Sequence, residues 1–303
     1  IGQLEPWVDR DQIWQAMGHL KWPVVVDGSH ARLKSHPLAF HGADAFCKVH
    51  KPPAFDLILC IGGRWISKHM STFLLADHVL HWSEGAKPVV HVTNRHQGSY
   101  KGLLSLSTQT HDMPVDGLNQ ALALATQAAI AAQPASDLGF IVSAFNQMAA
   151  PFDCFIANSL PIRLVDAMHV AHVRQVHVNR GASGIDGNIA TIMGLCLAET
   201  DVPLLAVVGD LAAVYDLNSF LLMPKVRRPV SILIINNGGG DIFSRLPSVA
   251  NRSDFNDMFK LAHQWPLANM IAAMGLNASR IDHPSALNLD FDRQVIECMT
   301  IEK

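Results

Sequence analysis

The sequence predicts an α/β protein of two doubly wound domains, each with a parallel sheet covered by helices. Short apolar runs rich in Val, Ile and Leu recur along the chain and are typical of buried strands. Stretches with helical spacing separate these runs, and this alternation predicts parallel strands joined by helices. A chain of 303 residues with 49% hydrophobic and 16% charged side chains is long and apolar enough for two ordinary domains.

Residues 1–115 are predicted to form the first domain. Its Val-, Ile- and Leu-rich runs are interpreted as buried strands, and its stretches with helical spacing are interpreted as helices. The predicted strands are 24–27, 56–63, 88–93 and 103–106, and the predicted helices are 10–20 and 66–75.

Residues 116–135 are predicted to form a helix that links the two domains. The run 118–133 is rich in Ala, Leu and Gln and favours a helix through intrinsic propensity. Pro134 interrupts this run, and a second helical stretch is expected up to residue 149.

Residues 136–303 alternate more regularly and predict the second domain. Ligands of such sheets collect at the carboxyl ends of the strands, where loops meet the first turns of helices. The loops that follow residues 157, 178, 208 and 235 are therefore the expected places for a site. The predicted strands are 154–157, 173–178, 204–208, 230–235 and 295–301, and the predicted helices are 161–169, 188–199 and 266–274.

The composition argues against several classes of function. Lys and Arg total 23 against 26 Asp and Glu, a formal charge of -3, so no overall positive field favours nucleic acid. The five cysteines include no C-x-x-C pair, which indicates reduced thiols in a cytoplasmic protein. No apolar run reaches the roughly 20 residues of a membrane span, and no signal peptide opens the sequence. Because the first residue is Ile1 instead of Met, an N-terminally shortened chain is expected.

Two loop motifs after neighbouring predicted strands indicate a metal site. Gly209-Asp210-Leu211 follows one strand and Asn236-Asn237 ends the next, with residues 212–235 forming one crossover between them. Parallel strands bring Asp210 and Asn237 to one edge of the sheet, and their oxygens suit Mg²⁺, which takes about six oxygen ligands and shares them with phosphates. A carbonyl from the glycine run, at Gly239, is the expected third ligand. Either motif alone is an ordinary turn signal, whereas the combination favours a metal site.

These motifs resemble those of thiamine-diphosphate enzymes, which carry Gly-Asp-Gly, some two dozen residues and then Asn-Asn. Four loop segments match one such family in order: ANSLPIR (157–163), NRGASGIDG (179–187), GDL with YDLN (209–211 and 215–218) and NNGGGDIFSRLP (236–247). Together they are similar to the MenD family, the 2-succinyl-5-enolpyruvyl-6-hydroxy-3-cyclohexene-1-carboxylate synthases of menaquinone biosynthesis, in which Leu after Gly-Asp is usual. The similarity is specific over residues 154–265 and weaker, though collinear, over residues 1–110.

The resemblance implies a cofactor, two substrates and a reaction. Thiamine diphosphate with Mg²⁺ or Mn²⁺ would be the cofactor, and 2-oxoglutarate and isochorismate would be the substrates. The implied transferase decarboxylates 2-oxoglutarate, releases CO2 and adds the resulting succinyl carbanion to isochorismate by conjugate addition. The two predicted domains would correspond to the family's central and diphosphate-binding domains.

The resemblance also assigns roles to residues on the four loops. Arg163 and Arg180 would bind substrate carboxylates, which planar guanidinium groups recognise well, and Ser159 would add a hydroxyl donor. Ile185 would hold the cofactor in its bent shape. For the arginines the alternative is a solvated surface position, and for the apolar residues it is core packing. The expected cofactor contacts are Ser183, Ile185, Gly209, Asp210, Leu211, Asn237, Ile242, Phe243 and Leu246.

One domain of the family's enzymes is not recognised in this sequence. It is the pyrimidine-binding domain, whose Glu activates the cofactor. We therefore expect a fragment that is inactive by itself, with that domain as its missing partner and a homodimer or homotetramer as the intact enzyme. The alternatives are a non-catalytic subunit of the same fold, or another thiamine-diphosphate enzyme such as a 2-oxoacid decarboxylase or an acetohydroxyacid-synthase-like enzyme; the paired arginines favour a dicarboxylate substrate.

Overall fold

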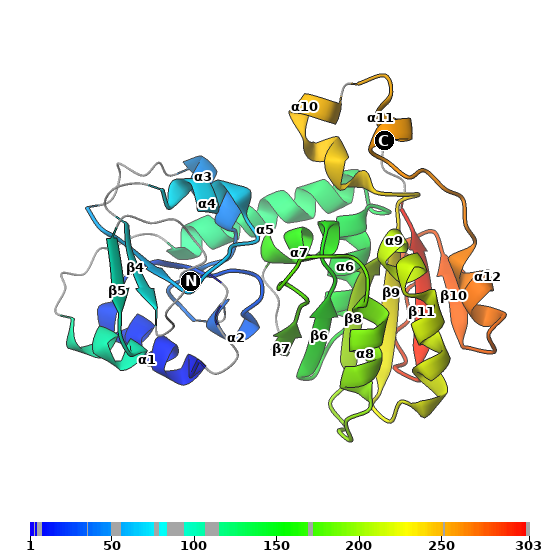
Figure 1. Ribbon diagram of the computed structural model, residues 1–303, viewed down its shortest axis with the longest axis horizontal. Coiled ribbons are helices and arrows are strands. Elements are labelled where there is room, and N and C mark those ends of the chain that lie inside the picture. Colours follow the sequence, from blue (N-terminus) through cyan, green and yellow to red (C-terminus); the bar gives the residue numbers. More distant parts are fainter. Residues whose placement is uncertain are drawn as a thin grey trace. The chain divides into compact units, whose positions relative to one another are not determined.

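The computed structural model divides the chain into two compact units (Figure 1). One unit comprises Ile1–Thr126 with Asp166–His169, and the other comprises Gln127–Val165 with Val170–Lys303. All of the strand pairs among the described residues are parallel, which confirms the predicted α/β class. The domain limits at 115 and 136 stay predictions. The residues that the structure describes are 1–2, 4, 8–34, 36–49, 56–75, 79–83, 94–106, 115–168, 172–250 and 252–300.

Two small parallel sheets form the first unit within these residues. Strands β1 (Val24–Val25) and β2 (Ala39–Phe40) pair with each other, and β3 (Ile58–Ile61), β4 (Val79–Ser83) and β5 (Asn94–Gln97) pair in that order. Helix α1 has the predicted bounds, Arg10–Leu20, because Asp9 caps its first turn and Lys21 ends it in the left-handed conformation. The other helices of this unit are α2 (Ala31–Lys34), α3 (Ala43–Val49) and α4 (Lys68–Phe73).

The strands predicted for the first unit agree only in part with those that the structure describes. The strand predicted at 103–106 is wrong, because Tyr100–Ser105 form a 3-10 helix that Ser99 caps through a hydrogen bond from the Lys101 N–H. The strand predicted at 88–93 lies outside the described residues. The strand β4 was not predicted, since the polar residues His81 and Ser83 interrupt its apolar pattern; His81 is nevertheless buried, with its Nε2 2.6 Å from the Gly62 carbonyl oxygen.

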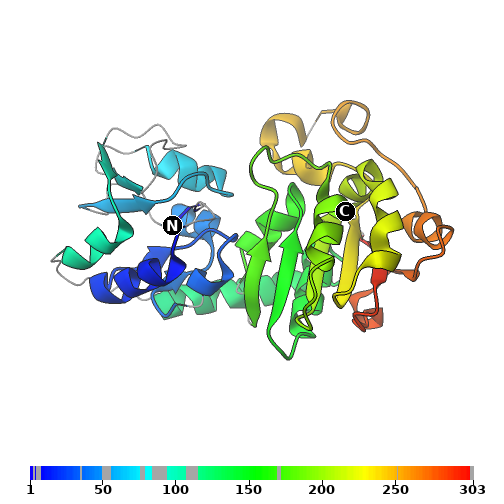
Figure 2. The same cartoon turned by 60° about the horizontal axis from the view of Figure 1, so that its bottom comes forward.

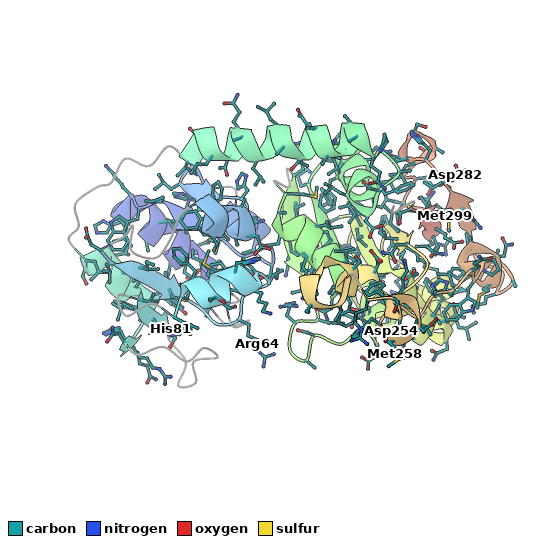
Figure 3. All side chains as sticks on the ribbon, turned by 90° about the horizontal axis from the view of Figure 1, so that it is seen from above. Arg64, His81, Asp254, Met258, Asp282 and Met299 are labelled. Atoms are coloured by element: carbon teal, nitrogen blue, oxygen red, sulfur yellow. The ribbon has the colours of Figure 1, made fainter. Side chains whose placement is uncertain are left out.

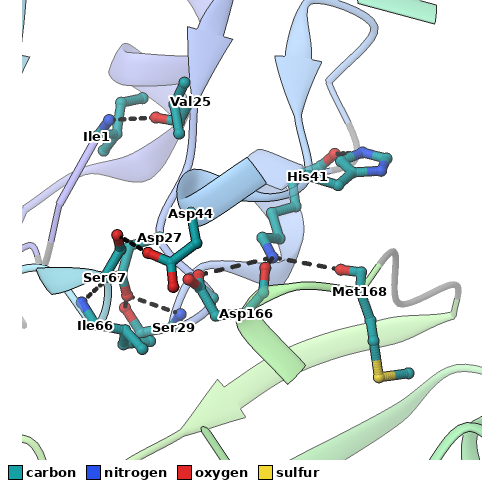
Figure 4. Close-up of polar contacts among 12 residues, drawn as sticks. Ile1, Val25, Asp27, Ser29, His41, Asp44, Ile66, Ser67, Asp166 and Met168 are labelled. Carbon is teal, nitrogen blue, oxygen red and sulfur yellow. Dashed lines mark hydrogen bonds and ion pairs between the residues drawn. The ribbon is translucent and has the colours of Figure 1, made fainter. Parts of the chain in front are cut away.

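The first unit contains a group of buried polar residues (Figure 4). Lys34 donates to the backbone carbonyls of Asp166 (2.6 Å) and Met168 (3.3 Å), and burial lowers the pKa of its ammonium group. Burial also raises the pKa of Asp166 to about 7. Asp27 accepts hydrogen bonds from Ser29 and from the Ile66 N–H, and Asp166 accepts one from the Gly28 N–H (2.6 Å), so backbone N–H groups hold both of these buried carboxyl groups.

A separate, largely apolar cavity of about 380 Å³ lies in the same unit. Its lining includes Trp22, Phe46, Ile58, Trp65 and Phe73.

Helices α5 (Val115–Ala132) and α6 (Asp137–Asn146) follow each other in the sequence. Ser136 caps α6 by accepting a hydrogen bond from the Gly139 N–H. In the part of the chain that is described, no single helix combines the length and hydropathy of a membrane span. The two helices meet that test only as a pair, and the chain bends by 116° between them.

The second unit is built on one parallel sheet of six strands, with helices on both faces (Figure 2). The strand order is β10-β11-β9-β8-β6-β7, so β8 lies between β6 and β9. The strands are β6 (Phe152–Ile156), β7 (Val173–His177), β8 (Leu204–Gly209), β9 (Val230–Asn236), β10 (Ala278–Ile281) and β11 (Gln294–Met299). The helices after α6 are α7 (Leu160–Asp166), α8 (Asn188–Cys196), α9 (Asp210–Tyr215), α10 (Pro247–Ala250), α11 (Phe255–Met258) and α12 (Leu267–Ala272), with 3-10 helices at Leu217–Lys225, Asp241–Arg245 and Pro284–Ala286.

The central strands of this sheet carry the core. Every residue of β6 and β9 is buried, which matches the uninterrupted apolar runs expected for strands covered on both faces. The amino end of β6 bears a buried carboxylate, Asp153, which accepts hydrogen bonds from Arg228 (2.6 Å) and Arg174 (3.0 Å). Asp153 is thus paired with two arginines at that end, and the loops at the opposite, carboxyl ends of the strands hold the polar groups of the candidate site.

Candidate cofactor-binding site

Four neighbouring strands deliver all of the predicted site residues to one edge of the sheet. The register pairs Gly209 of β8 with Ile235 of β9, so the residues that follow these two strands leave the sheet side by side. Ser159 lies in the loop after β6, and Arg163 lies on the helix α7 that follows it. The loop after β7 carries Arg180, Ser183 and Ile185, while the end of β8 and the start of α9 carry Gly209, Asp210 and Leu211. The segment after β9 carries Asn237, Gly239, Ile242, Phe243 and Leu246.

Asp210 is a buried carboxylate at this edge. Its Oδ1 accepts a hydrogen bond from the Leu211 N–H (2.7 Å), while its Oδ2 accepts one from the Gly239 N–H (2.9 Å) and lies 3.2 Å from Nε2 of His263. Burial raises the pKa of Asp210, and Asp137 adds to this rise, while the two N–H groups and His263 act in the opposite direction. The carboxylate therefore fastens the glycine run after β9 to the end of β8.

The glycine run after β9, residues 238–240, lies against the backbone of the segment 259–263. Gly238 has φ 75° and Gly239 has φ 138°, both in the region that favours glycine. An ideal Cβ on Gly239 would lie 2.5 Å from the Leu261 carbonyl oxygen, so this position has no room for a side chain. The His263 N–H donates to the Gly238 carbonyl (3.1 Å). Among the described residues, the Gly239 carbonyl accepts a hydrogen bond from the Asp241 N–H (2.9 Å), and a carbonyl oxygen has a second lone pair that can serve a ligand.

Asn237 presents an amide oxygen at the same edge. Its Nδ2 donates to Oδ2 of Asp137 at the start of α6 (3.0 Å), which fixes the orientation of the amide. Its Oδ1 is buried and has no hydrogen-bond partner among the residues that the structure describes. A buried acceptor without a partner is costly unless something else binds it, so this oxygen is suited to a cation.

These oxygen donors fit a magnesium-type ion better than a transition metal. The described residues contain no group of three or more His, Cys, Asp and Glu side chains that could hold a metal by themselves. Asp210, Asn237 and the Gly239 carbonyl instead offer a carboxylate, an amide oxygen and a backbone oxygen, which are hard ligands. Such a partial shell leaves positions for phosphate oxygens.

Asn158 connects the loops after β6 and β7. Its Nδ2 donates to the carbonyls of Asn179 (2.6 Å) and Gly184 (2.7 Å), which lie on either side of Arg180 and Ser183. Ser183 in turn donates to the Arg180 carbonyl (3.3 Å). The sequence motif contains Asn158, but we did not predict this role for it.

The two candidate arginines lie in different surroundings. Arg163 is exposed in the last turn of the short helix α7, and its guanidinium donates to the carbonyl of Ser159, a residue in the left-handed region with φ 73°. Arg180 is half-buried in the loop after β7. Both residues thus follow strands that end at the same edge of the sheet, and neither lies in the hydrophobic core.

The apolar candidates are not core residues either. Phe243 is 42% exposed and Leu246 is 40% exposed, while Ile185 is half-buried. Further exposed apolar side chains follow in the segment 255–265, namely Met258, Leu261 and Trp265. Met258 lies near Asp254 on the short helix α11 (Figure 3). Core packing therefore does not explain Phe243 and Leu246.

Sequence reasoning missed three polar residues that support this site. His263 lies against Asp210 and stacks on Trp265, with ring centroids 4.2 Å apart. Asp137 orients Asn237, and Glu297 on β11 accepts a hydrogen bond from Asn236 (2.6 Å). All three are distant in sequence from the residues that they contact, and no local motif signals them.

We expect Asn158→Leu to loosen the loop 179–185 selectively. The substitution removes two hydrogen bonds to partly buried carbonyls, so it should cost about 1–3 kcal/mol and speed amide exchange in this loop. Hydrogen–deuterium exchange of the loop peptides, with urea unfolding for the total stability, measures both effects. Ser159→Ala is the matched control at the neighbouring position, and unchanged exchange in Asn158→Leu would contradict the connecting role of Asn158.

Comparisons with known proteins agree with this geometry. Residues 161–300 match the family model of the thiamine pyrophosphate enzyme C-terminal TPP binding domain. The match begins within the first loop segment, 157–163, and includes the loops after β7, β8 and β9. A solved structure of a proposed thiamin diphosphate-dependent enzyme from Mycobacterium smegmatis has the same fold, with a TM-score of 0.67 over 98% of this chain and 60% of its own, at 15% sequence identity.

Similar curated proteins share a single description, 2-succinyl-5-enolpyruvyl-6-hydroxy-3-cyclohexene-1-carboxylate synthase. The protein from Aliivibrio fischeri is 41% identical over 88% of this chain and 49% of its own length. The protein from Shewanella frigidimarina is 31% identical over 95% of this chain and 52% of its own, and one from Roseiflexus is 28% identical over 91% and 50%. The chain spans about half the length of these relatives, and over that span it resembles the MenD family of synthases.

Proposed function

We propose that this chain comprises the central and diphosphate-binding domains of a 2-succinyl-5-enolpyruvyl-6-hydroxy-3-cyclohexene-1-carboxylate synthase in menaquinone biosynthesis. The observation that carries the proposal is the set of oxygen donors at the ends of β8 and β9. Asp210 is buried there, Asn237 has a buried oxygen with no partner in the described part of the chain, and Gly239 is held where a side chain would clash. The descriptions of the similar proteins supply the reaction.

The residues at this edge would hold thiamine diphosphate through Mg²⁺ or Mn²⁺. Asp210, Asn237 and the Gly239 carbonyl would be the protein ligands, and the metal would neutralise the diphosphate. When bound, thiamine diphosphate supplies the chemistry that decarboxylates a 2-oxo acid and transfers the remaining succinyl group. The loop residues Ser183 and Ile185 would contact the ring system, while Gly209, Leu211 and Ile242 would line the diphosphate end.

Arg163 and Arg180 would recognise the carboxylates of 2-oxoglutarate and isochorismate. Guanidinium groups bind carboxylates through two parallel hydrogen bonds, and both arginines follow strands that end at the cofactor edge, Arg163 on α7 and Arg180 in the loop after β7. Ser159, which precedes α7, would add a donor. Two carboxylates on each substrate match two arginines, which supports this substrate pair over pyruvate.

The exposed apolar residues would be covered in the assembled enzyme. Phe243 and Leu246 would form the wall beside the reacting carbon, where exclusion of water strengthens electrostatic interactions. They are exposed in this chain together with Met258, Leu261 and Trp265, so a further surface is needed to cover them. We propose that the pyrimidine-binding domain of another subunit provides it, within a homodimer or homotetramer.

All five cysteines are free, in keeping with a cytoplasmic enzyme.

Asp210→Asn is expected to weaken binding of thiamine diphosphate at least about tenfold in the presence of Mg²⁺, because it removes the only carboxylate of the proposed ligand set. Calorimetry with the cofactor, with and without Mg²⁺, measures this. Asp254→Asn, an exposed carboxylate in the same unit, is the control and should bind like the wild type. Failure of the wild-type chain to bind in the presence of Mg²⁺ would contradict the cofactor assignment.

Cofactor affinity is expected to fall as the pH is lowered, starting at a higher pH than an ordinary Asp would give. The metal needs the ionised carboxylate, and burial raises the pKa of Asp210 above its usual range. Affinity is therefore full above the raised pKa and is lost below it. His263→Leu removes a group that lowers this pKa, so the acid limb should move to higher pH in a titration by calorimetry. An unmoved limb would assign the titration to the diphosphate instead.

Arg163→Lys and Arg180→Lys are each expected to raise KM for 2-oxoglutarate about tenfold, with a smaller change in kcat, because an ammonium group cannot make the paired hydrogen bonds. Product formation is assayed with a separately produced pyrimidine-binding domain and with pyruvate as the comparison substrate. Equal use of pyruvate by the wild type would favour an acetohydroxyacid-synthase-like enzyme. Full turnover without the added domain would contradict the expectation that the chain is inactive alone.

A further inference from the structure

Glu297 is a fully buried carboxylate at the carboxyl end of β11. Its side chain is 0% exposed, and both of its oxygens are used. Oε1 accepts a hydrogen bond from Nδ2 of Asn236 (2.6 Å), and Oε2 accepts one from the Ala268 N–H in the first turn of α12 (2.8 Å). Strand β11 is the neighbour of β9, so Glu297 reaches across from the strand beside the one that ends in Asn236.

The Asn236 side chain connects Glu297 with the proposed metal-binding segment through a second hydrogen bond. While its Nδ2 donates to Glu297, its Oδ1 accepts a hydrogen bond from the Gly238 N–H (3.0 Å). This second bond closes a turn around Asn237, the residue between the two, and Gly238 takes a positive φ there. The rotamer of Asn236 therefore determines the direction in which Asn237 and Gly239 leave the sheet.

The two asparagines of the motif thus have different tasks. Asn237 has a buried Oδ1 that no described residue contacts by a hydrogen bond, whereas both polar atoms of the Asn236 side chain are satisfied inside the protein. Asn236 is 2% exposed, which leaves it no access to a ligand in the same position. The first asparagine belongs to the support of the turn and the second to the candidate ligand set.

We propose that Glu297 is a positioning residue that fixes the Asn236 side chain and, through it, the turn that presents Asn237 and Gly239. The proposal rests on the proposed function for its consequence, which is tighter binding of the metal–diphosphate group. The hydrogen-bonded chain from Glu297 through Asn236 to Gly238 stands on the structure alone. A carboxylate accepts at both oxygens, so it can serve the Asn236 amide and the Ala268 N–H together.

The direction of each hydrogen bond provides the test. Glu297→Gln replaces one acceptor by a donor, which then faces either the Asn236 amide or the Ala268 N–H. Asn236→Asp places a second carboxylate opposite Glu297. In the double variant Asn236→Asp/Glu297→Gln, the Gln donates to Asp and accepts from Ala268, while the other Asp oxygen still accepts from Gly238. All three hydrogen bonds are restored with the first one reversed.

Amide exchange in the cofactor-free chain is measured first, by hydrogen–deuterium exchange with resolution at Gly238 and Gly239. Each single variant should exchange about tenfold faster at these amides, since a charge-assisted hydrogen bond is lost, and the double variant should return close to the wild type. Ser231→Ala is the matched control, because Ser231 and Gln294 form a hydrogen bond between β9 and β11 at their amino ends. It should leave Gly238 and Gly239 unchanged.

Cofactor affinity is measured next, by calorimetry with Mg²⁺ and thiamine diphosphate. Weaker binding by both single variants and recovery in the double variant support the proposal. Unchanged exchange at Gly238 in Glu297→Gln, or no recovery in the double variant, overturns it. If a single variant does not fold, the double variant decides alone, since raised exchange there also overturns it. If the wild type does not bind, the proposed function is contradicted, whereas the exchange pattern still decides whether Glu297 holds the turn.

Discussion

The common direction of four neighbouring strands governs the site. Strands β7, β6, β8 and β9 are adjacent and parallel, so their carboxyl ends emerge at one edge and the following loops meet there. An antiparallel partner would send one of these loops to the opposite edge. The apolar residues of β6, β8 and β9 keep this arrangement rigid, because shifting a strand would expose buried side chains. Sheet order thus comes before any contact within the site.

Buried polar side chains then convert this coarse arrangement into defined loop geometry. Asn158 joins the loops after β6 and β7, Asp210 joins the end of β8 to Gly239, and Asn236 is fastened to Glu297. In each case a side chain at the end of one strand binds a group that belongs to another segment. Hydrogen bonds of this kind are strong inside an apolar surrounding, because leaving such groups unpaired is costly.

Much of the fold was accessible from the sequence, because long apolar runs identify buried parallel strands. The strands β8 and β9 and the helix α1 were predicted nearly at their observed bounds. Strands β4 and β10 escaped, since polar residues such as His81 and Arg280 interrupt their patterns. The 3-10 helix at Tyr100–Ser105 was mistaken for a strand, because a short apolar run has no distinct period.

For the candidate site, the sequence revealed the residues within local motifs and missed those that contact the motifs from distant parts of the chain. Asp210 and Asn237 were found because the spacing of their two motifs matches a crossover between parallel strands, whereas the other loop residues were assigned from the resemblance of the four loop segments to one family. His263, Asp137 and Glu297 were not found, since the motif residues that their side chains contact lie 53 to 100 residues away in the sequence. The assignment of Asn236 as a support rather than a ligand also depends on side-chain direction, which spacing does not contain.

The dependence of the Asn236 turn on β11 has a consequence for how the domain can be divided. Glu297 lies 61 positions after Asn236, yet it supplies an acceptor beneath the glycine run. A piece of this domain that ended before β11 would retain every motif residue of the four loops. It would nonetheless lack the Glu297 carboxylate that holds Asn236 and the loop after β9. The smallest functional piece is therefore larger than the stretch that carries the recognisable motifs.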